Sequence, residues 1–141
     1  MGADPLIRPM KEEDAEAVLR IQAAAGEASQ WDPRGYLAFE AIVLEWEGAV
    51  AAFLVTRRTA PDEQEILNIA VAPESRRRGF ARRLIAHALQ AGGIFYLEVR
   101  ESNTAARSLY RNLGFQECGR RPGYYRNPDE AAVIMRRDAG I

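Results

Sequence analysis

The sequence has few of the residues and segments that indicate a disulfide scaffold, a metal centre or a membrane protein. Its single cysteine, Cys118, excludes an internal disulfide, and its single histidine, His87, argues against a dedicated metal site. No run of residues approaches the roughly 20 apolar positions that span a bilayer, and the N-terminus has no apolar signal-peptide core. We therefore expect a metal-free cytoplasmic protein that does not contact a membrane.

An excess of charge of one sign is also absent. The chain has 19 Lys and Arg against 20 Asp and Glu, a formal net charge of -1. This balance disfavours direct nucleic-acid binding through overall charge. The length of 141 residues fits a single domain, residues 1–141, with one core of useful size, and the sequence has no repeat, low-complexity tract or linker.

Four segments have the features of helices. Residues 31–40 have Asp32 as an N-cap candidate and Pro33 at the first helical position, and Ser102 or Asn103 is the N-cap candidate of the last segment. Three longer segments, 11–25, 80–93 and 102–114, carry apolar stripes at helical spacing. These stripes consist of Ala15, Val18, Leu19 and Gln22, then Leu84, Ile85, Ala88 and Leu89, and then Ala106, Leu109, Tyr110 and Leu113.

Strand patterns alternate with these helices. Residues 6–10, 63–71 and 94–100 are expected strands, and residues 41–58 divide at Glu47-Gly48 into a hairpin. Residues 115–137 have the pattern of two strands around a long turn that contains Pro122, Gly123 and Pro128. The mixed order of elements predicts an α/β or α+β sheet flanked by helices.

The stretch "PESRRRGFARRL" places five arginines in the eight positions 76–83, directly before a predicted helix. A helix start leaves backbone N–H groups unpaired and favours negative charge, so this stretch is a candidate anion cradle. It is neither a Walker loop nor a dinucleotide fingerprint. Taken alone, it fits a solvated basic face equally well.

The spacing Arg76-x-x-Gly79-x-Ala81, after "LNIAV" and before an amphipathic helix, resembles the acyl-CoA-binding motif of the GNAT N-acetyltransferases. The stretches "YLEVRESNTAARSLYRNLGF" and "YYRNPDEAAVIM" extend the likeness to the bacterial RimI type, the ribosomal-protein-alanine N-acetyltransferases. Residues 66–135 match nearly without interruption, whereas residues 1–60 match only in outline.

The resemblance implies a mixed, mostly antiparallel twisted sheet of about seven strands, flanked by about four helices, with a V-shaped split between "EILNIAV" and "FYLEVR". Acetyl-CoA lies in this split in the family. The resemblance implies that backbone groups of the first strand pair with the pantetheine, that amides of residues 77–82 hold the pyrophosphate, and that Asn103 contacts the cofactor. The implied cofactor-binding residues are Ile69, Ala70, Val71, Arg77, Arg78, Gly79, Phe80, Ala81, Arg82 and Asn103.

Acetyl transfer to an amine needs one group to take a proton and another to protonate the leaving thiolate. Glu98 matches the general base of the RimI type, acting through water, and Tyr110 matches its general acid. From the residues alone, Glu98 fits a solvated surface group or a salt-bridge partner of Arg100, and Tyr110 fits a core tyrosine. A phenol with an ordinary pKa of about 10 stays protonated at neutral pH, as an acid must.

The resemblance also implies an acceptor, the N-terminal α-amine of a protein or peptide such as a ribosomal protein. Tyr124 and Tyr125 would line its channel, with Trp31 on the other side or buried as an anchor of the short helix. An α-amine, with a pKa of about 8, loses its proton more readily than a lysine near 10.4. Acidic residues Asp129 and Glu130 would meet basic residues further along the acceptor.

Two departures from the RimI pattern fall where acceptors are selected, namely Ala131 in place of an acidic residue and the segment 120–122, "RRP". A small amine or a lysine therefore stays open as the acceptor. A non-catalytic acyl-CoA-binding module is a second alternative, although binding alone requires neither Glu98 nor Tyr110. A nucleic-acid-binding module is disfavoured, because no aromatic residues are interleaved with the arginines.

Overall fold

A seven-stranded mixed sheet forms the centre of the molecule, in the order β1-β2-β3-β4-β5-β7-β6. The computed structural model describes residues 4–26, 30–126 and 128–139. Neighbouring strands are antiparallel except β4 and β5, which are parallel, so the expected sheet is confirmed. The strands are β1 (Leu6–Pro9), β2 (Glu40–Trp46), β3 (Ala49–Ala60), β4 (Glu63–Val71), β5 (Gly93–Arg100), β6 (Gln116–Tyr125) and β7 (Glu130–Ala139).

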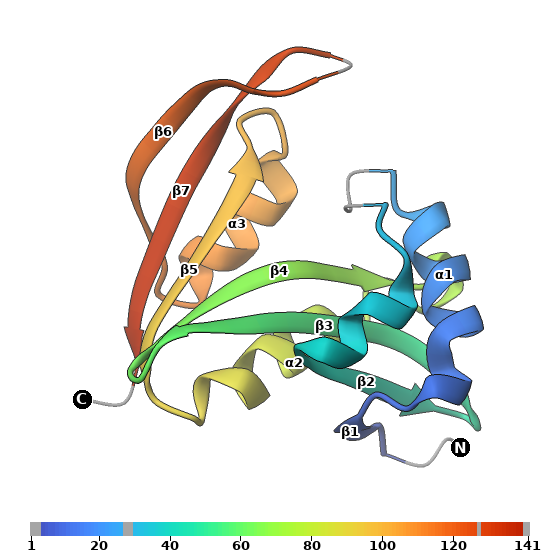
Figure 1. Cartoon of the computed structure of the whole chain (residues 1–141). Coiled ribbons are helices and arrows are strands. Elements are labelled where there is room, and N and C mark those ends of the chain that lie inside the picture. The colour runs from blue at the N-terminus through green and yellow to red at the C-terminus, as the bar shows by residue number, and fades with distance from the viewer. Residues whose placement is uncertain (1–3, 27–29, 127, 140–141) are drawn as a thin grey trace.

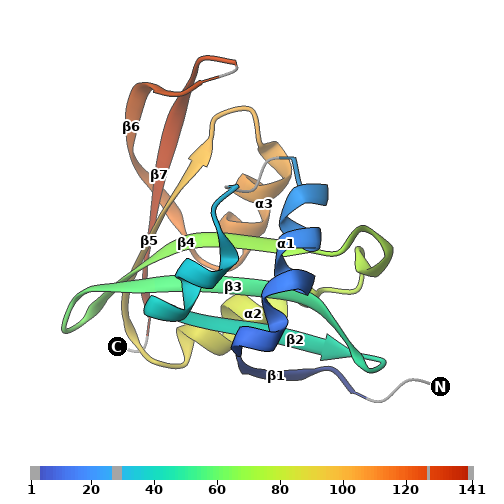
Figure 2. The ribbon, with the colours of Figure 1, turned by 45° about the vertical axis from the view of Figure 1, so that its right-hand side comes forward.

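Helices cover both faces of the sheet (Figures 1 and 2). On one face, α1 (Ala15–Ala24) and the 3-10 helix η2 (Pro33–Ala38) bury a core that includes Val18, Tyr36 and Phe53. On the other face, α2 (Phe80–Leu89) and α3 (Thr104–Asn112) pack on a second core. Two short 3-10 turns, η1 (Glu12–Asp14) and η3 (Pro73–Ser75), complete the described helices. No helix in these described ranges is long and apolar enough to cross a membrane.

The predicted caps and the first hairpin turn are confirmed. The Asp32 side chain accepts a hydrogen bond from the Arg34 amide at 3.1 Å, and Asn103 Oδ1 accepts one from the Ala106 amide at the start of α3, also at 3.1 Å. Glu47 and Gly48 both have positive φ, 53° and 79°, between the paired residues Trp46 and Ala49. This two-residue turn with two left-handed positions matches the twist of the hairpin.

Two details of the sequence prediction were wrong. Leu19 is 51% exposed, and Ile21, at 5%, packs in the core in its place, because the stripe that α1 turns toward the sheet is narrow and includes Val18, Ile21 and Gln22. Pro122 and Gly123 lie within β6 and not in the turn. Proline is tolerated there because β6 is an edge strand, where one side of the backbone needs no strand partner.

An irregularity in β4 switches its side chains from one face of the sheet to the other. Val55 pairs with Asn68 but the next residue of β3, Thr56, pairs with Ile66, so Leu67 is the extra residue of a β-bulge. Ile66 consequently packs in the core beneath α2 and α3. Asn68, two residues later, bonds instead to the side chains of Gln22 and Tyr36 on the α1 face.

The different burial of two similar residues on α1 predicts different costs of truncation. Ile21→Ala should lower the free energy of unfolding by about 2–5 kcal/mol, because it leaves a cavity in the core. Leu19→Ala on the same helix should change it by about 0.5 kcal/mol or less. Urea unfolding followed by circular dichroism measures both values. Equal losses for the two variants would contradict the observed orientation of α1.

Candidate active site

The central cavity lies where β4 and β5 part. The two strands pair only from Glu63–Ile66 to Ile94–Leu97 and then diverge (Figure 1). The gap holds a cavity of about 580 Å³. Both strands, α3 and the end of α1 contribute to its wall, which consists of residues 24–26, 66–69, 76, 97–100, 103, 105, 106, 110 and 125.

The parted end of β4 offers backbone groups toward this gap. Beyond Ile66, the side of β4 that faces β5 pairs with no other strand in the described part of the chain. Ile69 lines the cavity, whereas Ala70 is buried against the α1 core and Val71 is not part of the wall. Because a free strand edge presents alternating donors and acceptors, it can bind an extended chain that carries amides.

The arginine-rich turn leads into the start of α2, and of its residues Arg76 lines the cavity whereas residues 77–82 lie outside the cavity wall. Gly79 is the N-cap residue of α2, with φ of 78°, and no side chain caps the helix there. At the start of α2, the Arg83 amide donates a hydrogen bond to the Gly79 carbonyl at 3.0 Å. The amides that precede Arg83 in the first turn have no carbonyl partner within the helix. A Cβ at Gly79 would meet no atom within 4 Å. The turn therefore has an open surface with unpaired amides, of the kind that can bind an anion.

The arginine side chains of this turn have different surroundings. Arg76 lines the cavity. The guanidinium of Arg78 lies 4.1 Å above the Trp46 ring, and Trp46 in turn packs edge-on against Phe80. This cation–π contact holds Arg78 at the start of α2, so its positive charge lies beside the helix N-terminus.

Glu98 of β5 lines the cavity, and its side chain alternates along the strand with those of the buried Leu97 and Val99. Its side chain is 16% exposed, and its Oε1 lies 3.1 Å from Nη2 of Arg121. Its Oε2 is buried and has no hydrogen-bond partner among the described residues. Arg100 is not the ion-pair partner of Glu98, because it bonds to Glu130 at 3.2 Å and to the Pro128 carbonyl.

Tyr110 belongs both to the core and to the cavity wall. It is 5% exposed and packs edge-on against Phe115, with ring centroids 5.6 Å apart. Burial, with a smaller contribution from Tyr125, raises the pKa of its hydroxyl above the ordinary value. Tyr110 is therefore a protonated donor at neutral pH, and its hydroxyl has no hydrogen-bond partner within the described ranges.

Of the three aromatic residues expected at the acceptor, one lines the cavity and two do not, although the rings of Tyr124 and Tyr125 are in edge-on contact with centroids 5.1 Å apart. Tyr125 lines the cavity, and burial, followed by the charge of Glu98, raises its pKa to about 12. Tyr124 and Trp31 are each half-exposed and lie outside the cavity wall. Trp31 is thus not a buried anchor of η2, although its ring contacts Tyr36 edge-on.

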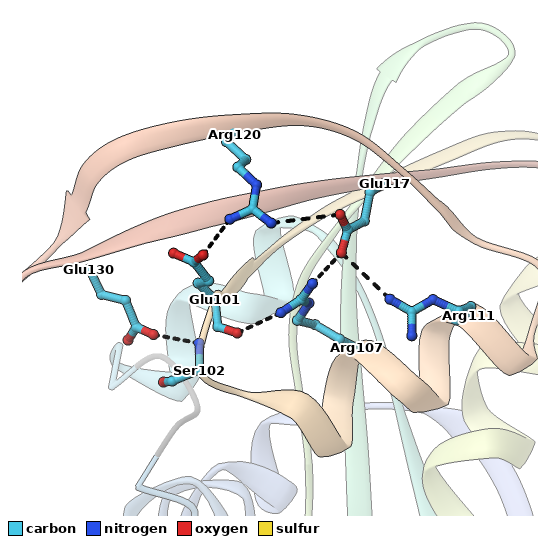
Figure 3. A network of polar contacts seen from close by, with 7 residues as sticks. All are labelled: Glu101, Ser102, Arg107, Arg111, Glu117, Arg120 and Glu130. Atoms are coloured by element: carbon cyan, nitrogen blue, oxygen red, sulfur yellow. Dashed lines mark hydrogen bonds and ion pairs between the residues drawn. The ribbon is translucent and has the colours of Figure 1, made fainter.

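A network of charges fastens the hairpin of β6 and β7 to α3 and the loop before it (Figure 3). Glu117 on β6 pairs with Arg107 and Arg111 of α3 and with Arg120. Hydrogen bonding from Arg107 lowers the pKa of Glu117. On the neighbouring strand, Glu130 accepts a hydrogen bond from the Ser102 amide. Glu130 is therefore engaged within the chain.

Sequence reasoning missed three residues of this region. Arg76 opens the recognised motif, yet its place in the cavity wall was not foreseen. Arg121 was noted only as a departure from a pattern, and its ion pair joins strands that are not adjacent in the sheet. Asn68 is a polar residue in an apolar strand, and this contrast was the one signal that could have indicated its buried bonds to Gln22 and Tyr36.

Comparisons with known proteins agree with this geometry. The model of the acetyltransferase (GNAT) family matches residues 8–115. An N-alpha-acetyltransferase RimI from Mycobacterium tuberculosis is 48% identical over 85 residues, which cover 59% of this chain and 54% of that protein. The chain thus spans about half the length of that relative.

Two comparisons with Escherichia coli cover more of the chain. The [ribosomal protein bS18]-alanine N-acetyltransferase is 42% identical over 107 residues, 71% of this chain and 70% of that protein. The crystal structure of the ribosomal-protein-S18-alanine N-acetyltransferase superposes with a TM-score of 0.84 at 31% identity, covering 98% of this chain and 96% of the other.

Proposed function

The chain belongs to the acetyltransferase (GNAT) family, and we propose that it transfers an acetyl group from acetyl-CoA to the N-terminal α-amine of a protein. The observation that carries this proposal is the convergence of Glu98 from β5 and Tyr110 from α3 on one cavity between the parted strands. A carboxylate and a protonated phenol are the two groups that this reaction needs. The single free cysteine, Cys118, is exposed and suits a reducing compartment such as the cytoplasm.

The residues around the split fit acetyl-CoA. The edge of β4 at Ile69 to Val71, which pairs with no strand on the β5 side in the described part of the chain, supports pairing with the amides of a pantetheine arm. The Ile69 amide donates to Oδ1 of Asn68 at 3.0 Å and would have to exchange this bond for one to the ligand. The uncapped start of α2 supports binding of the pyrophosphate through the amides of residues 77–82. Asn103 caps α3 and also lines the cavity, so both roles expected of it are compatible.

In the proposed mechanism, Glu98 takes the proton that the acceptor nitrogen loses, through a water molecule. The loss of this proton gives the nitrogen the free electron pair with which it attacks the acetyl carbon. Tyr110 then donates its proton to the departing thiolate sulfur, and its raised pKa keeps that proton in place until the thiolate forms.

The identity of the acceptor rests on the relatives. The E. coli proteins are named as alanine N-acetyltransferases of ribosomal protein bS18 or S18, and a similar acceptor is proposed here. The α-ammonium group of a protein N-terminus has a lower pKa than the ammonium group of a lysine, so a single carboxylate can deprotonate it more easily. Glu130 is engaged with Arg100 and Ser102. Asp129 is exposed but lies 3.7 Å from Nη1 of Arg126, so a basic acceptor residue would compete with Arg126 for it.

A lysine or a small amine is the second candidate acceptor, because Trp31 and Tyr124 do not narrow the cavity as expected. Two peptides distinguish the candidates: one begins with alanine and has a free N-terminus, and the other has the same sequence, a blocked N-terminus and an internal lysine. We expect acetylation of the free peptide alone when both are incubated with acetyl-CoA and analysed by mass spectrometry. Faster acetylation of the blocked peptide, or of small amines only, contradicts the α-amine assignment.

Gly79 and Gly48 provide a matched pair that tests binding at the start of α2. Both have φ near 78° and open space at the Cβ position, so a side chain strains both turns similarly. Gly79→Glu should weaken binding of CoA at least about tenfold, since it places a negative charge where the pyrophosphate would bind. Gly48→Glu should bind like the wild type in isothermal calorimetry. Unchanged affinity of the Gly79 variant would refute the assigned anion site.

Tyr110→Phe should slow turnover by about 10²- to 10⁴-fold while CoA binding and folding are retained. The folding expectation follows because the Tyr110 hydroxyl makes no hydrogen bond in the described part of the chain. Steady-state kinetics on the purified variant gives the rate, and Tyr96→Phe, on β5 but outside the cavity, is the control. If Tyr110 acts only as a core residue, the two variants will turn over equally fast.

A further inference from the structure

The two carboxylate oxygens of Glu98 have different surroundings. Oε1 forms the ion pair with Arg121 at 3.1 Å. Oε2 is buried and has no partner among the residues described. A buried unpaired oxygen is unfavourable and uncommon in native proteins, so it indicates a partner that arrives with a ligand or with water. Oε1 is therefore occupied by the ion pair with Arg121, and Oε2 is available to accept a hydrogen bond or a proton.

Arg121 reaches Glu98 across an intervening strand. Glu98 pairs with Ile134 of β7, and Arg121 of β6 pairs with Ala132 of the same strand. The Arg121 side chain is 56% exposed, so its guanidinium approaches Oε1 from the solvent side. Its guanidinium carbon also lies 5.4 Å from the centre of the Tyr124 ring.

The backbone around Arg121 is held on both sides. Arg120 pairs with Glu101 and Glu117, next to α3 (Figure 3). Pro122 follows, and its ring restricts φ. Because consecutive side chains of a strand point to opposite faces, anchoring Arg120 toward α3 directs Arg121 to the other side of β6.

We propose that Arg121 is a positioning residue that holds Oε1 of Glu98, so that Oε2 is the oxygen that receives the proton of the acceptor amine. This inference rests on the proposed acetyl transfer. The N–H bond of the acceptor breaks, its proton passes through water to Oε2, and the nitrogen electron pair is freed to attack. Arg121 neither gains nor loses a proton in this step.

The kinetic experiment compares Arg121 with an arginine of β7 that does not contact Glu98. Arg121→Met should lower kcat by about 10- to 100-fold, because a misplaced proton acceptor slows the reaction steeply. The KM for acetyl-CoA should stay within about twofold of the wild-type value. This is the result expected when a substitution removes an interaction that stabilises the transition state but not the bound substrate. Arg121→Lys should restore part of the rate. Arg136→Met on β7, which removes a charge that pairs with Asp138 and does not contact Glu98, should keep the wild-type kcat.

A double-mutant cycle with Glu98→Gln identifies the route by which Arg121 acts. If Arg121 works through Glu98, adding Arg121→Met to Glu98→Gln should slow turnover no further. Independent, multiplying losses overturn the proposal. An Arg121→Met enzyme with an unchanged or higher kcat also overturns it, since Arg121 would then be either irrelevant or an obstacle to the acceptor.

Crystal structures of the wild type and of Arg121→Met give a readout that does not depend on activity. We expect the Glu98 carboxylate to leave its wild-type position in the variant, with Oε2 displaced relative to the Tyr110 hydroxyl. An unmoved Glu98 refutes the positioning role. If the wild type acetylates no amine, the proposed function fails, whereas the crystallographic comparison still decides whether Arg121 positions Glu98.

Discussion

The separation of two parallel strands after only four paired residues is the constraint on which the site depends. If β4 and β5 stayed paired along their whole length, the cavity between them would be closed and both backbone edges would be used by the sheet. Their divergence leaves the edge of β4 beyond Ile66 free and allows Glu98 to line a cavity. The divergence of β4 and β5 therefore provides both the unpaired strand edge for binding and the position of Glu98 in the cavity wall.

Hydrogen bonds and ion pairs stabilise the strands on both sides of this split, which we call its two arms. On one arm, the bulge at Leu67 turns Asn68 to the α1 face, where it bonds to Gln22 and Tyr36. These buried bonds satisfy polar groups that would otherwise be costly. On the other arm, Glu117 joins β6 to α3 through arginines. Individual exposed pairs contribute little, but a network fixes the geometry of a hairpin better than any one of them.

Helix α3 links folding and chemistry in the proposed enzyme. Asn103 begins the helix by capping it and also lines the cavity. Two turns later, Tyr110 packs against Phe115 in the core and faces the same cavity. A phenol in this position is rigid because it is packed, and it is a weak acid because it is buried. The same burial thus orients the group and keeps its proton in place.

Much of the fold follows from local patterns in the sequence. Alternating apolar residues specify the strands, Asp32 and Asn103 specify helix starts, and Glu47-Gly48 specifies the hairpin turn, because each of these signals acts over a few neighbouring residues. The spacing from Arg76 to Ala81 and the resemblance around it were sufficient to indicate the family, which the comparisons confirmed.

Tertiary structure alone decided how distant segments meet. The orientation of α1, which exposes Leu19 and buries Ile21, depends on the surface beneath the helix and not on its own periodicity. The β4 bulge depends on its register with β3. The pairing of Glu98 with Arg121, in place of Arg100, depends on a strand order in which β7 lies between β5 and β6. Sequence determined which groups were present, and the order and register of the strands determined which of them touch.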